Sequence, residues 1–166
     1  MNIYMTSGTY DFLKRIKEKH SKETMLLMQN NEGAVLIHET LRKTVFSAPR
    51  SYDILKSEGL LENSGFLVLN HIPVMDDDKP VFEYRFKNDQ SLINKQPGLL
   101  ALRVLRPIKS NTYVILTLWK NEKLYLDWEN TPSYQSLLQG AKSSSAQPQI
   151  FTGASYTSKY YIPSED

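Results

Sequence analysis

Residues 65–74 read GFLVLNHIPV, and this stretch decides the fold. Apolar side chains fill both sets of alternating positions, which predicts a β-strand covered on both faces. Asn70 lies on the face of Phe66 and Val68, where a carboxamide without hydrogen-bond partners costs about 1–3 kcal/mol. The sequence leaves two interpretations of Asn70 open: it satisfies a neighbouring backbone group, or its amide N–H points into a cavity and donates to a ligand.

The segments that follow this strand complete a recognisable order of elements. A helix is predicted from Pro80 to about Lys95, because Phe82 and Phe86 form an apolar stripe and Pro97-Gly98 ends it. Two strands, a helix capped by Asn121 that includes Trp128, and a closing strand are predicted next: residues 99–106, 112–119, 121–128 and 155–162. The resulting β-α-β-β-α-β order is the ferredoxin-like split.

The first sixty residues predict a shorter version of the same order. The expected elements are a strand at 3–6, a helix capped by Thr9, a hairpin of 25–29 and 34–39, a third strand at 44–46 and a short helix at 51–57. The fold class is therefore α+β, with ferredoxin-like halves packed as an intramolecular pseudo-dimer of the dimeric α/β-barrel type. The expected domains are a degenerate N-terminal half, residues 1–60, and a second half, residues 65–162. An internal pair predicts a monomer.

Composition excludes several classes of function. The 166 residues carry 20 basic and 18 acidic side chains without a basic stripe, so no nucleic-acid partner is expected. The absence of cysteine excludes disulfides, thiolate metal sites and a cysteine nucleophile. No apolar run approaches 18 residues and no signal peptide is recognisable, so we expect no membrane partner and a cytoplasmic location.

The remaining candidates are single residues rather than motifs. His71 beside Leu67 and Leu69 is read as a hydrogen-bonded core residue in preference to a metal ligand. Trp128 is read as core packing or as part of a ligand pocket. No nucleotide-binding, zinc-protease or serine-hydrolase signature occurs. The residues alone thus predict an α+β protein with a small pocket.

Four runs in the second half carry a resemblance to a known family: VLNHIPV (68–74), QPGLLALRVLRP (96–107), TYVILTLW (112–119) and DWENTPSY (127–134). They are similar to the antibiotic biosynthesis monooxygenase (ABM) superfamily, and within it to the IsdG-type haem-degrading monooxygenases. The runs YMTSGTYDFLK (4–14) and LIHET (36–40) extend the resemblance to two-part members from bacilli and to TRAP-like regulatory proteins of staphylococci.

The resemblance implies functional residues. IsdG-type enzymes use an Asn, Trp and His triad, of which Asn70 and Trp128 match the first two. The axial His follows the Trp by ten residues, but that position here is Leu138, and no His follows His71. Leucine has no lone pair for iron. Haem would lie in an apolar slot lined by Phe82 and Phe86, with the Asn directing dioxygen to the ring edge and the Trp distorting the ring.

The function implied is oxidative opening of haem with release of iron. Haem would be both substrate and cofactor, with O2 and an external electron donor, a reductase. The absent axial His leaves open a non-catalytic haem or apolar-ligand carrier or a TRAP-like regulator. It also leaves open iron ligation by Tyr134 or Tyr156. A third possibility is a cofactor-free ABM oxygenase acting on an aromatic substrate.

Overall fold

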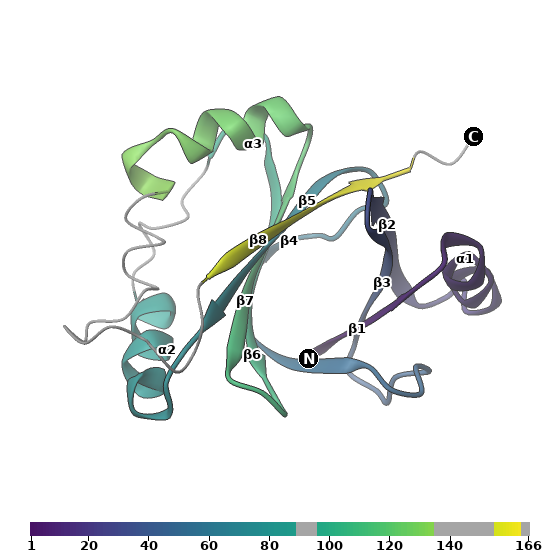
Figure 1. Cartoon of the computed structure of the whole chain (residues 1–166), viewed down its shortest axis with the longest axis horizontal. Helices are drawn as coiled ribbons and strands as arrows, with labels where there is room; N and C mark the ends of the chain where they lie inside the picture. Colours follow the sequence, from purple (N-terminus) through teal and green to yellow (C-terminus); the bar gives the residue numbers. More distant parts are fainter. Residues whose placement is uncertain (89–95, 135–154, 164–166) are drawn as a thin grey trace.

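The described strands close into one barrel with helices on its outside (Figure 1). The computed structural model describes residues 1–88, 96–134 and 155–163. The elements are β1 (Asn2–Gly8), α1 (Tyr10–Lys19), β2 (Thr24–Asn30), β3 (Gly33–Thr40), β4 (Arg50–Gly59), β5 (Gly65–Pro73), a 3-10 turn η1 (Asp76–Asp78), α2 (Lys79–Asn88), β6 (Leu99–Pro107), β7 (Thr112–Trp119), α3 (Glu122–Glu129) and β8 (Tyr156–Ile162). None of the helices in these ranges is long and apolar enough to span a membrane.

The two halves have the same strand order. Around the barrel the strands run β1-β3-β2-β8-β5-β7-β6-β4, so each half has its four strands in the order 4-1-3-2. The fourth strand of each half pairs with the second strand of the other, β4 with β6 and β2 with β8. This exchange confirms the ferredoxin-like pseudo-dimer. The domain boundary between residues 60 and 65 stays a prediction.

The expected helix at 51–57 is wrong, because these residues belong to strand β4. This strand pairs with β1 through Arg50–Asp53 and with β6 through Tyr52–Gly59, so its backbone groups are satisfied on both sides. Pairing with distant strands therefore overrides the local helix signal. The expected strand at 44–46 is also wrong: no strand forms there, and Phe46 packs in the cluster beneath α1.

The caps predicted for two helices are confirmed. The Thr9 hydroxyl accepts a hydrogen bond from the Phe12 amide at the start of α1. The Asn121 side chain accepts one from the Leu124 amide at the start of α3. Residues 89–95, where the end of the second helix was expected, lie outside the described residues. The Thr9 and Asn121 caps fix where α1 and α3 begin.

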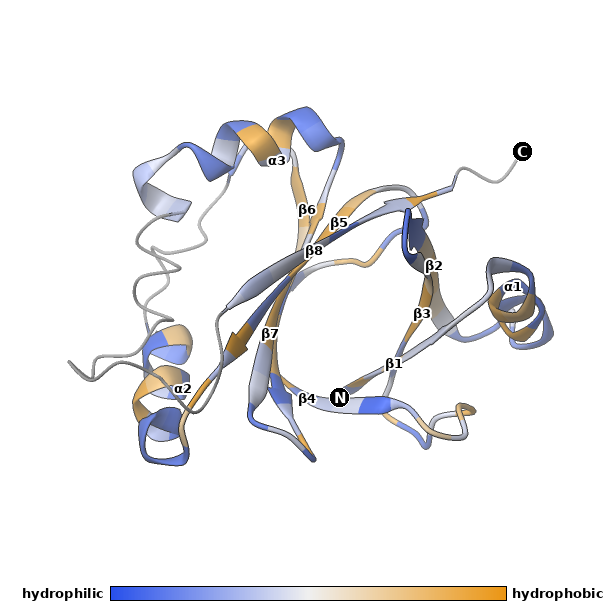
Figure 2. Cartoon of the chain, in the orientation of Figure 1, coloured by the Kyte–Doolittle hydropathy of each residue, from blue (hydrophilic) through white to orange (hydrophobic). Residues whose placement is uncertain are grey.

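Apolar residues form three clusters around the barrel wall. Figure 2 shows apolar residues along the barrel strands and mixed polar and apolar residues on the helices. One cluster fills the barrel interior and includes Leu67 and Leu69 of β5. A second lies between the outer face of β5–β7 and the helices α2 and α3, and the third lies under α1. Strand β5 is covered on both faces, as its sequence predicts.

A buried ion pair joins the two halves inside the barrel. Arg103 of β6 is 2% exposed and its Nε donates to Glu39 Oε2 of β3 over 2.7 Å. Its guanidinium also donates to the carbonyls of Glu58 and Gly59, at 2.8 and 2.9 Å. Arg103 therefore ties strand β6 of the second half to β3 and β4 of the first.

Candidate functional site

One row of paired residues crosses the outer face of the sheet beneath α2 and α3. In β-sheet register Asn70 lies opposite Ile115 on β7, Ile115 opposite Val104 on β6, and Val104 opposite Lys56 on β4. On the other side of Asn70 the row ends at Thr157 of β8. Directly paired side chains lie on the same face of a sheet, so these residues share the surface that the helices cover. We call this surface the slot face.

Among the described residues, the side-chain oxygen of Asn70 has a hydrogen-bond partner and its side-chain nitrogen has none. The side chain is 2% exposed, and its Oδ1 accepts a hydrogen bond from the Thr157 hydroxyl at 2.8 Å. Its Nδ2 is buried and has no partner among the described residues. The partner of the carboxamide is therefore a side chain rather than the neighbouring backbone. Among the described residues, the amide N–H therefore has no acceptor and is available to a ligand.

Trp128 shows the same combination of packing and an unused donor. Its indole is 3% exposed and packs against Trp119 and Tyr134, with ring centroids 5.1 and 5.0 Å apart. Its Nε1 is buried without a partner in the described part of the chain. Trp119 is different, because its Nε1 donates to the Thr117 hydroxyl at 2.8 Å. Trp128 therefore resembles a ligand-facing group, and Trp119 does not.

Helix α2 contributes the aromatic wall that the sequence predicts. Phe82 and Phe86 are both buried, with ring centroids 4.8 Å apart. They belong to the same cluster as Trp128 and as Phe66 and Val68 of β5. The slot face, α2 and α3 therefore meet in one apolar region.

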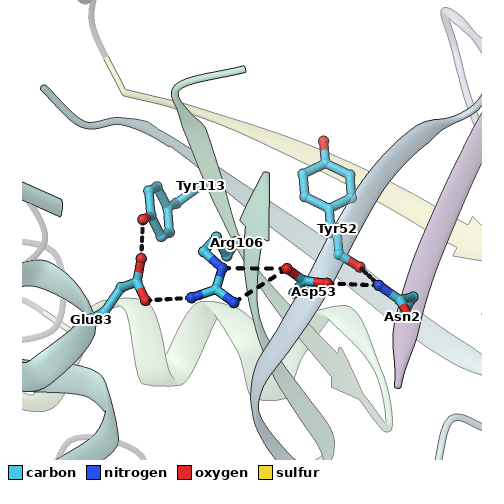
Figure 3. Close-up of polar contacts among 6 residues, drawn as sticks. All are labelled: Asn2, Tyr52, Asp53, Glu83, Arg106 and Tyr113. Atoms are coloured by element: carbon cyan, nitrogen blue, oxygen red, sulfur yellow. Dashed lines mark hydrogen bonds and ion pairs between the residues drawn. The ribbon is translucent and has the colours of Figure 1, made fainter. Parts of the chain in front are cut away.

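Polar contacts hold α2 against the barrel (Figure 3). Glu83 accepts hydrogen bonds from the Tyr113 hydroxyl and from Arg106 Nη1, the latter at 2.9 Å. Arg106 also binds Asp53 of β4 at 3.2 Å, and Asp53 accepts a 2.8 Å hydrogen bond from Asn2 of β1. Burial and the bond to Glu83 raise the pKa of Tyr113, so its phenol stays a donor. These contacts fix the helix that carries Phe82 and Phe86.

Lys56 is a residue of the slot face that the sequence analysis missed. Its Nζ is buried and lacks a hydrogen-bond partner among the described residues. A β-bulge between Ile54 and Lys56 turns Leu55 toward the helix-covered cluster and Ile54 toward the barrel interior. Alternation from Tyr52 and Ile54 would have assigned Lys56 to the barrel interior, so the sequence alone could not place it on the slot face; the bulge does.

The two tyrosines considered as iron ligands lie in different places. Tyr134 packs against Trp128, and burial raises the pKa of its phenol, which disfavours the phenolate that iron needs. Tyr156 stacks on His71, with centroids 4.2 Å apart, and Asn70 lies on the opposite face of β5. Ligation by Tyr156 is therefore wrong for this slot. Leu138 lies outside the described residues.

His71 is a core residue, as the sequence predicts. It is 3% exposed and its Nε2 lies 3.2 Å from the Ser158 hydroxyl. Burial and the charge of Arg50 lower the pKa of His71 to about 4. Among the described residues no three His, Asp or Glu side chains are grouped to hold a metal ion.

The family match of the second half indicates the class of protein. The family model for antibiotic biosynthesis monooxygenases matches residues 65–139, and this stretch contains both Asn70 and Trp128. Residues 65–139, most of the second half of the chain, therefore match an ABM domain.

Particular relatives cover nearly the whole chain. A heme-degrading monooxygenase of Listeria monocytogenes is 22% identical across 97% of this chain and 94% of its own length. The signal transduction protein TRAP of Staphylococcus epidermidis is 25% identical across 100% of this chain and 99% of its own.

Solved structures show the same fold. A major regulator of staphylococcal pathogenesis has a TM-score of 0.86 at 22% identity, covering 99% of this chain and 100% of its own. The heme-degrading enzyme of L. monocytogenes has a TM-score of 0.78 at 21% identity, covering 98% and 100%. The chain is thus similar both to an enzyme and to regulators.

Proposed function

We propose that this chain binds haem between the slot face and helices α2 and α3, and opens the porphyrin as a monooxygenase. The observation that carries the proposal is the pair of buried N–H groups on Asn70 and Trp128 that find no acceptor in residues 1–88, 96–134 and 155–163. Each unsatisfied buried donor costs about 1–3 kcal/mol, so such groups are uncommon unless a ligand supplies the acceptor. The similarity to a heme-degrading relative supports the same substrate.

The chemistry of the side chains between the sheet and the helices suits a flat, largely apolar ligand. Phe82, Phe86 and Trp128 provide an apolar enclosure that excludes water. When haem is bound and reduced, its iron supplies the activation of dioxygen, with O2 and a reductase as co-reactants. Thr157 orients the Asn70 amide so that its N–H can donate toward the reacting face of the ring. The Trp128 indole presses on the ring and sets its shape.

Lys56 extends the proposal to the charged edge of the substrate. Lys56 on β4 lies three strand spacings, about 14 Å along the row, from Asn70 on β5. A buried ammonium without a partner is unfavourable, and a carboxylate is the group that satisfies it. Lys56 therefore binds a propionate of haem and brings a residue of the first half into the site. The cytoplasmic location, the monomer and the reductase stay predictions.

Asn70→Leu tests whether the carboxamide serves a ligand. Wild type should shift the Soret band of haemin and, with a reductant and air, lose that band. Asn70→Leu should bind haemin but degrade it at least about tenfold more slowly, as expected for a lost reaction-specific hydrogen bond. Without haemin, the variant should be about as stable as wild type in urea, because the gain from removing an unpaired buried donor offsets the lost hydrogen bond from the Thr157 hydroxyl.

Asn121→Leu is the matched control. It removes a carboxamide that caps α3, so it should lose about 1 kcal/mol of stability and keep the rate of haemin degradation per folded molecule. Equal destabilisation by both substitutions would show that Asn70 is structural. A wild-type protein that leaves the haemin spectrum unchanged would overturn the proposed function.

A haem carrier or a TRAP-like regulator is the alternative, supported by Leu138 in place of the axial His and by the staphylococcal relatives. A carrier would shift the Soret band without losing it, and a regulator that acts through protein contacts would leave the band unchanged. Leu138→His discriminates between the two: haemin turnover that appears only in this variant would show that the natural chain is not the enzyme.

Lys56→Met tests the contact with the substrate edge. The variant keeps the length of the apolar stem, so folding should be retained. Its affinity for haemin should fall about tenfold, which corresponds to about 1.4 kcal/mol for a charged hydrogen bond. Wild type and Lys56→Met should bind haemin dimethyl ester equally. A tenfold loss for the ester as well would contradict a role for the carboxylate.

A further inference from the structure

One end of the barrel contains a cavity of about 310 Å³ that is separate from the slot. It is lined by residues of both halves, including Arg50 and Tyr52 of β4, His71 of β5, and Tyr156 of β8. His71 lies on the opposite face of β5 from Asn70, because neighbouring residues of a strand point to opposite sides. The cavity is large enough for a small organic molecule.

The charges around this cavity have one sign. Arg50 and Lys109 line it, and none of the described residues that line it carries a carboxylate. Neither cation forms an ion pair with an acid in the part of the chain that the structure describes. The Arg50 guanidinium has a single long contact, 3.5 Å, to the Ser7 hydroxyl. A concave surface with unpaired positive charge concentrates anions.

The wall of the cavity is aromatic, with Tyr52 and His71 buried and Tyr156 57% exposed at its edge. Tyr52 is 5% exposed, and His71 stacks on Tyr156 with an angle of 9° between the ring planes. The low pKa of His71 keeps its ring neutral at pH 7, so it lines the cavity as a flat aromatic group. The hydroxyls of Ser51, Ser110 and Thr112 add hydrogen-bonding groups around the cavity. A bare inorganic ion would make no contact with the aromatic rings of this wall.

We propose that this cavity binds a small aromatic anion carrying a carboxylate or phosphate group. Arg50 and Lys109 bind the charged group by charge-assisted hydrogen bonds, and Tyr52 and the His71–Tyr156 stack contact the ring. Because the lining comes from both halves, the ligand joins them at the end of the barrel. This site requires neither Asn70 nor Trp128 and is independent of the haem proposal.

Titration of the full chain without haem tests this site. The probes are phenyl phosphate, benzoate, inorganic phosphate and phenol. Binding of each is measured by the melting temperature of the protein and by the NMR signal of the His71 ring. One of the two aromatic anions should bind saturably, move the His71 signal, and raise the melting temperature by about 5 °C or more at 100 times its Kd. Which of them binds more tightly identifies the charged group.

Two substitutions should weaken this binding, and two should not. Arg50→Gln and Lys109→Gln should each raise the Kd about tenfold, the loss expected for one charge-assisted contact. Lys14→Gln, on the exposed side of α1, and Asn70→Leu should leave the Kd unchanged. Equal weakening by Lys14→Gln, or the absence of saturable binding, would overturn the proposal. Binding of inorganic phosphate or phenol as tight as that of phenyl phosphate would overturn the choice of an aromatic anion.

Discussion

Arg103→Met is expected to lower the free energy of unfolding by about 3–5 kcal/mol, the cost of breaking a buried ion pair by removing one partner. The substitution leaves the Glu39 carboxylate, whose side chain is 12% exposed, without its cation inside the barrel. It also leaves the carbonyls of Glu58 and Gly59 without the donors that Arg103 provides. Urea unfolding at pH 7, followed by tryptophan fluorescence, measures the loss.

The control for this prediction is another arginine of the same strand. Arg106→Met removes a cation whose side chain is 42% exposed, so it should cost about 1 kcal/mol or less. The double variant Arg103→Met/Glu39→Met should recover most of the loss, because two apolar side chains replace a pair that is costly to desolvate. If Arg103→Met costs no more than Arg106→Met, the ion pair does not hold the halves together.

The sequence predicts the parts of this fold that depend on local chemistry. The alternation in residues 65–74 places Leu67 and Leu69 inside the barrel and Phe66 and Val68 outside it, as the structure has them. The caps Thr9 and Asn121 depend on contacts three residues away and are likewise confirmed. Asn70 is identified as unusual because a period-two pattern assigns its face without knowledge of any partner strand.

The parts of the fold and of the site that the sequence does not predict depend on contacts between distant residues. Strand β4 reads as a helix locally, and its pairing with β1 and β6 joins residues about fifty apart in the chain. Lys56 enters the slot face only through that pairing. The aromatic anion cavity likewise combines Arg50, His71, Lys109 and Tyr156, which no sequence window brings together. The role of Leu138 stays a prediction.

Acid is expected to destabilise this protein through His71, by about 3 kcal/mol between pH 6.5 and pH 4. In the unfolded chain a histidine binds its proton near pH 6.5, whereas burial and Arg50 lower the pKa of His71 in the fold to about 4. Between these values the unfolded state binds more protons, so stability falls as the pH falls and levels off below pH 4. Burial of the His71 ring and the positive charge of Arg50 oppose protonation of the folded state.

His71→Gln should flatten this pH dependence, even if the substitution also lowers stability at pH 7. Burial lowers the pKa of His38 as well, so part of the slope should remain in the variant. Lys14→Gln, on the exposed side of α1 and away from both histidines, serves as the control. The measurement is the free energy of unfolding in urea at half-unit steps from pH 4 to pH 7.5. A His71→Gln slope equal to that of wild type would mean that the His71 ring takes up its proton within the fold, and the neutral wall proposed for the cavity would then be wrong.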